Sequence, residues 1–526
     1  MSSFRHTYQP SGETPVLARE TRRCLDRAVV ACLEAQRPNG SWATPARPRI
    51  LENALAAFAL AGAGHHSGHR SRVHAWLRQA EPQRHDDFTA AADAWLRALA
   101  LDATAPPALP VLPRAGAAHR RRLILLQTLG VAAGVPGCSP HTLLAHTTAA
   151  LGHRDRASLT GWHRAQLLSA EIIARHAADL PVGDSLVAAL TAEQSPDGSF
   201  HTMPLVTAMA CLALTRAAPG RAATHRCTAR LLADQHPDGT WRFTTFDVWD
   251  TGLMVRCLRG HSDFDTRARP MALDFLAGVQ SPQGGWGSVS GAIAGTGLAS
   301  DVDTTGNTLL ALADTEQGRR AWPTAAEYAR THQDDQGLWT TWNTAVDTMA
   351  QDTVAHMVAG IRAHHPEEVE VRRATQWLLR RHRRAGRWTA DWYVFPGYPA
   401  AEISPVVGWH SEAARSEART LAATQNKDGG WPAFPGANSS SPAATALAVT
   451  VLIRSRTGTA QALERAARFL FESQQNDGTW VEPDPTMCGP RPFLTDVASQ
   501  THALTCRGLI DLLHNPPAVP LPPSES

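Results

Sequence analysis

A short pattern, Gln-x-x-x-Gly-x-Trp, recurs along the chain and limits the folds open to it. Complete copies begin at Gln36, Gln235, Gln280, Gln333, Gln425 and Gln474. Gln194 begins a variant that ends in Phe, and His382 begins one that keeps the Gly and the Trp. Seven of these eight copies end in Trp, in a chain with only 16 Trp residues, so chance does not account for the pattern. A recurring unit of this kind indicates a repeat architecture.

Each copy follows an apolar stretch with helical character, such as residues 28–35. Most copies have Asp, Asn or Pro before the Gly, which is the composition of a tight turn. We therefore expect each Gln to end a helix, the Gly to form a turn, and the Trp to fold back and pack. The Gln amide is expected to bind free N–H groups of the next helix, while the indole supplies buried area.

The spacing of the copies predicts an all-α fold of helical hairpins. From Gln235 onward the copies lie 45, 53, 49, 43 and 49 residues apart, enough for two helices each. Six such hairpins closing on themselves would make an α/α barrel. The chain before about residue 225 has clear copies only at positions 36 and 194 but is still rich in Ala and Leu. It is expected to form a second helical domain with a more degenerate repeat.

Composition excludes several classes of function. The net charge of +2 gives no reason to expect a nucleic acid partner. Eight scattered cysteines without a C-x-x-C pair indicate free thiols in a reducing cytosol, so we expect a cytoplasmic protein. No apolar run reaches the length of a transmembrane helix, and the polar start shows no signal peptide. The preference for Arg over Lys and the abundance of Ala suggest a GC-rich bacterial genome.

Two acids and two hydroxyls stand together in Asp301-Val302-Asp303-Thr304-Thr305, shortly before the apolar run 309–312. Asp is favoured at a helix start, so the simplest interpretation of this stretch alone is a helix cap. The repeats around it make a chemical role more probable than that interpretation.

Helical repeats combined with this D-x-D-T-T stretch resemble the class II terpene cyclases, which include squalene–hopene cyclase and copalyl diphosphate synthases. The family usually has D-x-D-D, and Thr304 in place of the last acid resembles the bacterial drimenyl diphosphate synthases. Residues 390–399 are similar to an aromatic, proline-containing segment of copalyl diphosphate synthases. Residues 352–356 are similar to their T-N-A-H-V segment, but Val354 replaces the Asn, so no base is inferred from it.

The resemblance implies two α/α barrel domains, the β and γ domains of these cyclases. Residues 1–22 would form an N-terminal segment packed on the catalytic barrel, 23–224 the γ-like barrel, and 225–526 the β-like catalytic barrel. The oligomeric state stays open, with a homodimer as one option.

The resemblance also implies roles for the acidic stretch. Asp303 would be the general acid that protonates an alkene, and Asp301 its orienting partner. Thr304 and Thr305 are the nearby hydroxyls that could stabilise the carboxylate left behind. The resulting cation needs aromatic faces and the exclusion of water. The candidates for that lining are Phe246, Trp249, Trp342, Trp392, Tyr393, Phe395 and Tyr398.

The chain has no D-D-x-x-D motif, so we expect the diphosphate of the substrate to survive in the product. Its seat would be formed by Arg side chains and one Mg²⁺, with Arg47, Arg49 and Glu52 as candidates. The implied reaction is the bicyclisation of farnesyl diphosphate to drimenyl diphosphate. The alternative is a copalyl-type reaction of geranylgeranyl diphosphate.

Other readings of the repeats stay open at this point. A prenyltransferase β-subunit would need a zinc site with a D-x-C element, which the chain lacks. A glycosidase would use two carboxylates in an open cleft. A non-catalytic helical scaffold would leave the D-x-D-T-T stretch unexplained.

Overall fold

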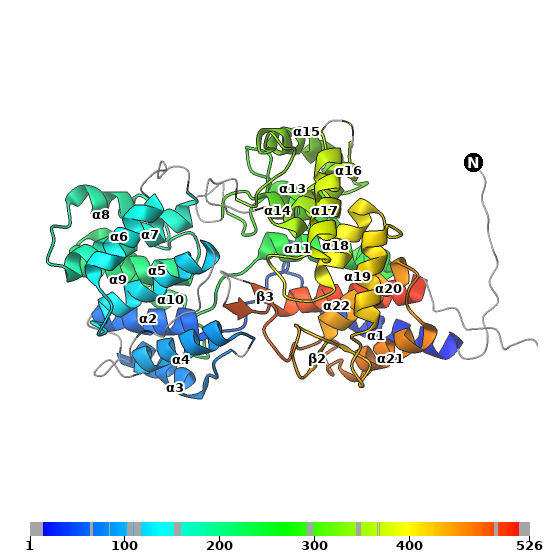
Figure 1. Ribbon diagram of the computed structural model, residues 1–526, viewed down its shortest axis with the longest axis horizontal. Helices are drawn as coiled ribbons and strands as arrows, with labels where there is room; N and C mark the ends of the chain where they lie inside the picture. Colours follow the sequence, from blue (N-terminus) through cyan, green and yellow to red (C-terminus); the bar gives the residue numbers. More distant parts are fainter. Residues whose placement is uncertain are drawn as a thin grey trace, which may run out of the picture.

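The computed structural model describes residues 14–63, 67–83, 85–101, 109, 117–151, 159–291, 298–342, 349–365, 367, 369–488 and 493–514. Within these residues the protein is mostly helical and has almost no strand, which confirms the expected all-α class. The helices gather into two groups that lie side by side (Figure 1).

In the described part of the chain, six helices form a closed inner ring in the larger group. They are α11 (Asp247–Leu258), α14 (Val302–Ala311), α16 (Gln351–Arg362), α18 (Tyr398–Val407), α20 (Pro442–Arg454) and α22 (Ala498–His514). Each contacts the next in this order, and α22 contacts α11 to close the ring. The inner helices are buried along most of their length, so the core of this group lies around them.

An outer helix precedes or follows each inner one. Five outer helices come from the same half of the chain: α13 (Arg269–Gly278), α15 (Glu316–Thr331), α17 (Arg372–Ala385), α19 (Glu412–Ala422) and α21 (Ala460–Glu472). The sixth is α1 (Thr14–Ala35), which contacts α21, α22 and the short α12 (Ser262–Arg267). In Figure 1 the blue α1 lies next to the red α22 at the base of the larger group. The barrel is therefore completed by the N-terminal helix.

The smaller group holds the helices between α1 and α11. They are α2 (Ile50–Gly62), α3 (Ser67–Gln79), α4 (Asp87–Leu101), α5 (Ala117–Ala132), α6 (Pro140–Leu151), α7 (Gly161–Ala177), α8 (Asp184–Thr191), α9 (Pro204–Ala217) and α10 (Ala222–Ala233). Contacts of α9 with α2, α7 and α10, and of α2 with α4, tie the group together.

The expected domain boundaries fall inside helices. The boundary at 22/23 cuts α1, and the boundary at 224/225 cuts α10, which packs on α9. Because a helix is a rigid unit, the contacts divide the chain between α1 and α2 and again between α10 and α11. Residues 1–13 of the expected N-terminal segment lie outside the described residues.

The Gln of each repeat joins its own turn to a neighbouring outer helix. Gln280 donates from Nε2 to the carbonyl of Gly284 (2.8 Å) and to that of Ala321 in α15 (3.0 Å). Gln474 donates in the same way to Gly478 and to Cys24 in α1, both at 2.9 Å. The expected bond to free N–H groups is wrong: the amide nitrogen donates to carbonyl oxygens instead.

This pattern also corrects the expected assignment of the repeat copies to the two helix groups. Gln36 donates to the carbonyl of Ala268, so the first copy of the repeat belongs to the larger group. Gln235 donates to His69 in α3, so that copy belongs to the smaller group. The six hairpins therefore do not begin at Gln235, because spacing along the chain does not show which helices become neighbours.

The Trp of each repeat is fixed by its indole nitrogen. In Trp42, Trp241, Trp286, Trp339, Trp388, Trp431 and Trp480, Nε1 donates to a carbonyl ten residues earlier. All are buried, so the indole fills the space between helices while its one donor is satisfied. The Gly is required as well: Gly284 has φ +91°, and a Cβ there would lie 2.0 Å from the carbonyl oxygen of Thr324.

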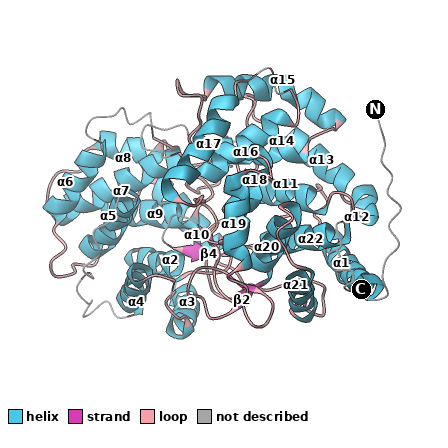
Figure 2. Ribbon diagram, turned by 45° about the vertical axis from the view of Figure 1, so that its right-hand side comes forward, coloured by secondary structure: helices cyan, strands magenta, loops and turns pink. Residues whose placement is uncertain are grey.

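Two short antiparallel pairs of β-strands lie among the helices (Figure 2). Strand β1 (Trp431–Pro432) pairs with β2 (Ser440–Ser441), and β3 (Met487–Cys488) pairs with β4 (Leu494–Thr495). Among the residues that the structure describes, none of the helices has both the length and the apolar character needed to cross a bilayer.

Replacing Gln474 by Ala should loosen the closure of the barrel. The variant loses two partly buried hydrogen bonds from the Gln474 amide to backbone carbonyls, and also the bond that Arg27 donates to Gln474. We therefore expect the free energy of unfolding to fall by about 1–3 kcal/mol. The neighbouring Gln475 is exposed and its amide reaches only Ser473, so Gln475→Ala is the matched control. Urea unfolding of both variants checks this; equal losses would contradict the assigned role.

Candidate active site

The acidic stretch begins inner helix α14, and Asp301 caps it. Oδ1 of Asp301 accepts the backbone N–H of Thr304 at 2.7 Å, and Oδ2 accepts the Thr304 hydroxyl at 2.9 Å. Burial raises the pKa of Asp301 to about 8, against the effect of these hydrogen bonds. The cap interpretation is thus confirmed for Asp301, whose carboxyl is bound to Thr304.

Thr305 serves the repeat architecture. Its hydroxyl accepts the backbone N–H of Trp286 at 3.0 Å and donates to the carbonyl of Asp301 at 2.6 Å. Thr251 and Thr445, on other inner helices, hold the N–H groups of their own repeat Trp residues in the same way. Of the two threonines in the acidic stretch, Thr304 therefore belongs to the helix cap and Thr305 to the repeat.

Asp303 lies two residues after Asp301, in the first turn of α14, and has a different partner. Its Oδ1 is 2.7 Å from Nδ1 of His356 on α16, and both side chains are buried. The other ring nitrogen of His356 lies 3.0 Å from Oε2 of Glu402 on α18. Three consecutive inner helices thus contribute one residue each to a buried line of acid, imidazole and acid.

Two arginines complete this line. Arg256 on α11 donates to Oε2 of Glu402 at 2.7 Å, and Arg507 on α22 donates to Oε1 at 2.5 Å. Burial alone would raise the pKa of Glu402, but the two guanidinium groups hold it well below its usual range. Glu402 is therefore a fixed negative charge in the middle of the barrel.

The charge of Glu402 sets the protonation of His356. Burial alone would lower the pKa of His356, but Asp303 and Glu402 together raise it to about 9. A charged imidazole donates from both nitrogens, so Oδ1 of Asp303 is an acceptor.

The hydroxyls expected to assist Asp303 are bound elsewhere. Thr304 donates to Asp301 and Thr305 donates to a backbone carbonyl. His356, Glu402 and Arg256 were missed as site residues, since they lie far from the acidic stretch in sequence. The one available signal was the pairing of Asp352 and His356 one turn apart in an otherwise apolar helix.

Four of the predicted aromatic residues gather around His356. Trp249 and Tyr398 make edge contacts with its ring, at centroid distances of 5.8 and 6.4 Å. Tyr393 accepts the indole N–H of Trp249 at 3.0 Å, and it packs on both Tyr398 and Phe395. These contacts place aromatic faces beside the Asp303 and His356 pair.

The other three predicted aromatics make different contacts. Trp342 and Trp392 meet edge to face at 6.1 Å, and Trp342 also meets Trp162 of the smaller group at 6.0 Å. Phe246 packs on Phe243 at the start of α11. Trp342 therefore lies where the two helix groups meet.

The residues expected to bind diphosphate and metal are bound to other groups of the protein. Arg49 and Glu52 form a buried ion pair with each other, and Arg49 also donates to the carbonyl of Phe493. Arg47 binds Asp496 at 2.7 Å and the carbonyl of Glu482. As arranged, these three residues do not fit a diphosphate with Mg²⁺, because their charges already neutralise protein groups. Among the described residues, no cluster of three or more His, Cys, Asp or Glu is placed to hold a metal ion.

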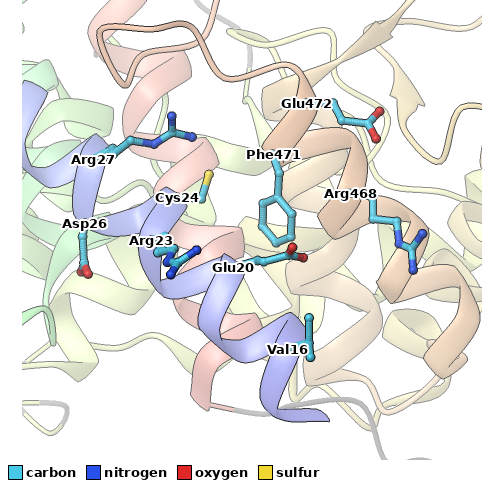
Figure 3. A pocket seen from close by; sticks show the side chains of 9 residues that line it. All are labelled: Val16, Glu20, Arg23, Cys24, Asp26, Arg27, Arg468, Phe471 and Glu472. Atoms are coloured by element: carbon cyan, nitrogen blue, oxygen red, sulfur yellow. The ribbon is translucent and has the colours of Figure 1, made fainter. Parts of the chain in front are cut away.

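A surface hollow of about 810 Å³ lies between the outer helices α1 and α21. Charged side chains of both signs, including Glu20, Arg23 and Arg468, line it together with Phe471 (Figure 3). It contains none of the predicted site residues.

Comparison with known proteins agrees with this geometry. A family model described as the squalene–hopene cyclase C-terminal domain matches residues 406–502. Drimenyl diphosphate synthase of Streptomyces showdoensis is 28% identical over 90% of this chain and 91% of its own length. Drimenyl diphosphate synthase of Streptantibioticus cattleyicolor is 28% identical over 95% of this chain and 96% of its own. The chain is thus similar to class II terpene cyclases over nearly its whole length.

This relationship confirms the resemblance seen in the repeats and the acidic stretch. The structure of ent-copalyl diphosphate synthase from Streptomyces platensis matches with a TM-score of 0.57 at 18% identity. It covers 95% of this chain and 99% of that one, so the two proteins share the fold. The relatives named here are synthases of cyclic terpene diphosphates.

The charge of His356 predicts how stability depends on pH. Its folded pKa of about 9 lies above the ordinary value of 6.5, so its contribution is complete below pH 6.5 and is lost as pH rises through 9. His356→Gln should therefore lower the melting temperature strongly at pH 6.5 and much less at pH 9.5. An equal difference at both pH values would contradict a charged His356.

Proposed function

We propose that this cyclase protonates the terminal alkene of farnesyl diphosphate through Asp303 and closes two rings to give drimenyl diphosphate. The observation that carries the proposal is the contact between Oδ1 of Asp303 and the charged ring of His356. The diphosphate takes no part in ionisation and stays in the product.

An alkene is a very weak base, so its protonation needs a strong acid held away from water. Asp303 must be neutral when substrate arrives and must become a stable anion afterwards. The imidazolium of His356 stabilises that anion in a buried setting, where a charge-assisted hydrogen bond is stronger than in water. Glu402 and its two arginines keep the imidazolium in place throughout, so the acid is strengthened without any rearrangement.

The developing cation also needs stabilisation. The rings of Trp249, Tyr393 and Tyr398 lie beside His356 and offer electron-rich faces near the donor. Their burial keeps water out, which favours ring closure over capture of the cation by water.

The choice of a fifteen-carbon substrate is supported by the two relatives named drimenyl diphosphate synthases, which align with nine tenths of the chain or more. The alternative, a copalyl-type reaction of geranylgeranyl diphosphate, is supported by a shorter match: the labda-7,13-dienyl diphosphate synthase of Streptomyces clavuligerus aligns with 62% of the chain at 27% identity. Mg²⁺ is proposed as the counter-ion of the diphosphate.

The substrate is tested by incubating the purified enzyme with farnesyl or geranylgeranyl diphosphate and Mg²⁺. The products are dephosphorylated and identified by mass spectrometry. We expect drimenol from the fifteen-carbon substrate at a kcat/KM at least about tenfold above that for the longer chain, and the same assay with EDTA should be slower. Turnover of the longer substrate alone would favour the alternative.

Asp303→Asn should abolish cyclisation. The amide cannot deliver the proton, and loss of a general acid costs about 10²–10⁴-fold or more in kcat. Asp301→Asn is the matched control, because it keeps the contact of Asp303 with His356 and mainly weakens the cap. It should lose stability while keeping measurable cyclisation. Retained cyclisation by a folded Asp303→Asn variant would exclude Asp303 as the acid.

A further inference from the structure

A second buried acid lies one helical turn from His356. Asp352 begins α16 and is completely buried. Residues four apart on a helix share a face, so Asp352 and His356 both point toward the region of Asp303. Oδ2 of Asp352 accepts the backbone N–H of Asp391 at 3.0 Å and that of Trp392 at 3.5 Å.

The other oxygen of Asp352 differs from Oδ2. Oδ1 has no hydrogen-bond partner among the described residues. An unpaired buried oxygen of this kind costs free energy, and such groups often have a chemical role. Within the described residues, no hydrogen bond of the repeat architecture uses this oxygen.

The charges around Asp352 suit a proton acceptor of intermediate strength. Burial, together with the nearby carboxyl groups of Asp303 and Asp391, raises the pKa of Asp352 to about 7. The imidazolium of His356 acts in the opposite direction. The group can therefore exist either as a carboxylate or as an acid near neutral pH.

The other acids in this region are already occupied. Glu402 binds two arginines and His356, and Asp301 is held by Thr304. Asp250 accepts from Ser499 and Gln500. Asp303 is bound to His356 through Oδ1.

We propose that Oδ1 of Asp352 accepts the methyl proton that the bicyclic cation loses in the last step of the reaction. This inference rests on the proposed function. The C–H bond breaks, its electron pair forms the exocyclic double bond and quenches the cation, and the proton forms an O–H bond on Asp352. Asp352 becomes neutral as the product forms.

The balance of protons supports this assignment. The reaction is an isomerisation, so each turnover adds one proton at a ring carbon and removes one from a methyl group. Before turnover Asp303 carries the proton and Asp352 is a carboxylate; afterwards the two states are exchanged. Two nearby buried carboxyls favour sharing one proton, because both cannot easily be ionised together.

The test compares wild type with Asp352→Asn, in D₂O, with farnesyl diphosphate and Mg²⁺. Deuterium in the cyclised product or in recovered substrate reports protonation by Asp303, and product structure reports the last step. The variant should still incorporate deuterium, while the exocyclic alkene falls at least tenfold as a fraction of cyclised product. Hydroxylated or endocyclic products should replace it, and Asp352→Glu should restore part of the alkene.

Two results would overturn the inference. An Asp352→Asn variant that forms the exocyclic alkene in the wild-type proportion would show that another base acts. A folded variant that incorporates no deuterium would place Asp352 in the first step instead. If the Asn variant does not fold, Asp352→Ser, which also lacks the carboxylate, carries the same expectations. Wild type that cyclises no prenyl diphosphate would instead refute the proposed function, and the inference with it.

Discussion

The hydrogen bond from each repeat Gln to a carbonyl of a neighbouring outer helix holds the barrel together. Single bonds of this kind contribute about 1 kcal/mol each, but they recur around a closed ring and act on rigid helices. Because the ring is closed, each inner helix is fixed by neighbours on both sides. The site depends on this, since its residues come from α11, α14, α16, α18 and α22 and meet only where the helices converge.

Within the ring, one buried ion network surrounds Asp303. Glu402 is kept ionised by Arg256 and Arg507, and its charge keeps His356 protonated. A buried pair is costly unless every partner is satisfied, and here the carboxylate has a partner on each oxygen. The network extends through Asn307, which accepts from Arg256 and donates to the carbonyl of Trp249. The surroundings of Asp303 are thus built from residues of five helices.

Local sequence signals predicted the features that depend on neighbours in the chain. The Gly and Trp of the repeat and the cap at Asp301 follow from turn and capping chemistry, which operates over a few residues. The partner of Asp303 could not be found in this way, because His356 lies 53 residues further on and is brought near only by ring closure. Thr305 was assigned to the acid for the opposite reason: it is close in sequence, but the repeat uses its hydroxyl. The diphosphate site suggested at Arg49 and Glu52 was proposed without knowing that these two residues form a buried ion pair with each other, which the sequence does not reveal.

The use of α1 as the sixth outer helix has a consequence for synthesis of the chain. Its partner Gln474 lies 450 residues after Cys24. At a synthesis rate of about 5–20 residues per second, the N-terminal helix emerges from the ribosome on the order of 20–90 s before that partner exists. During this interval the smaller helix group can complete its own contacts, whereas the barrel cannot. The apolar face of α1, with Leu25 and Val29, must wait for α21 and α22, so the first helix made is among the last to be placed.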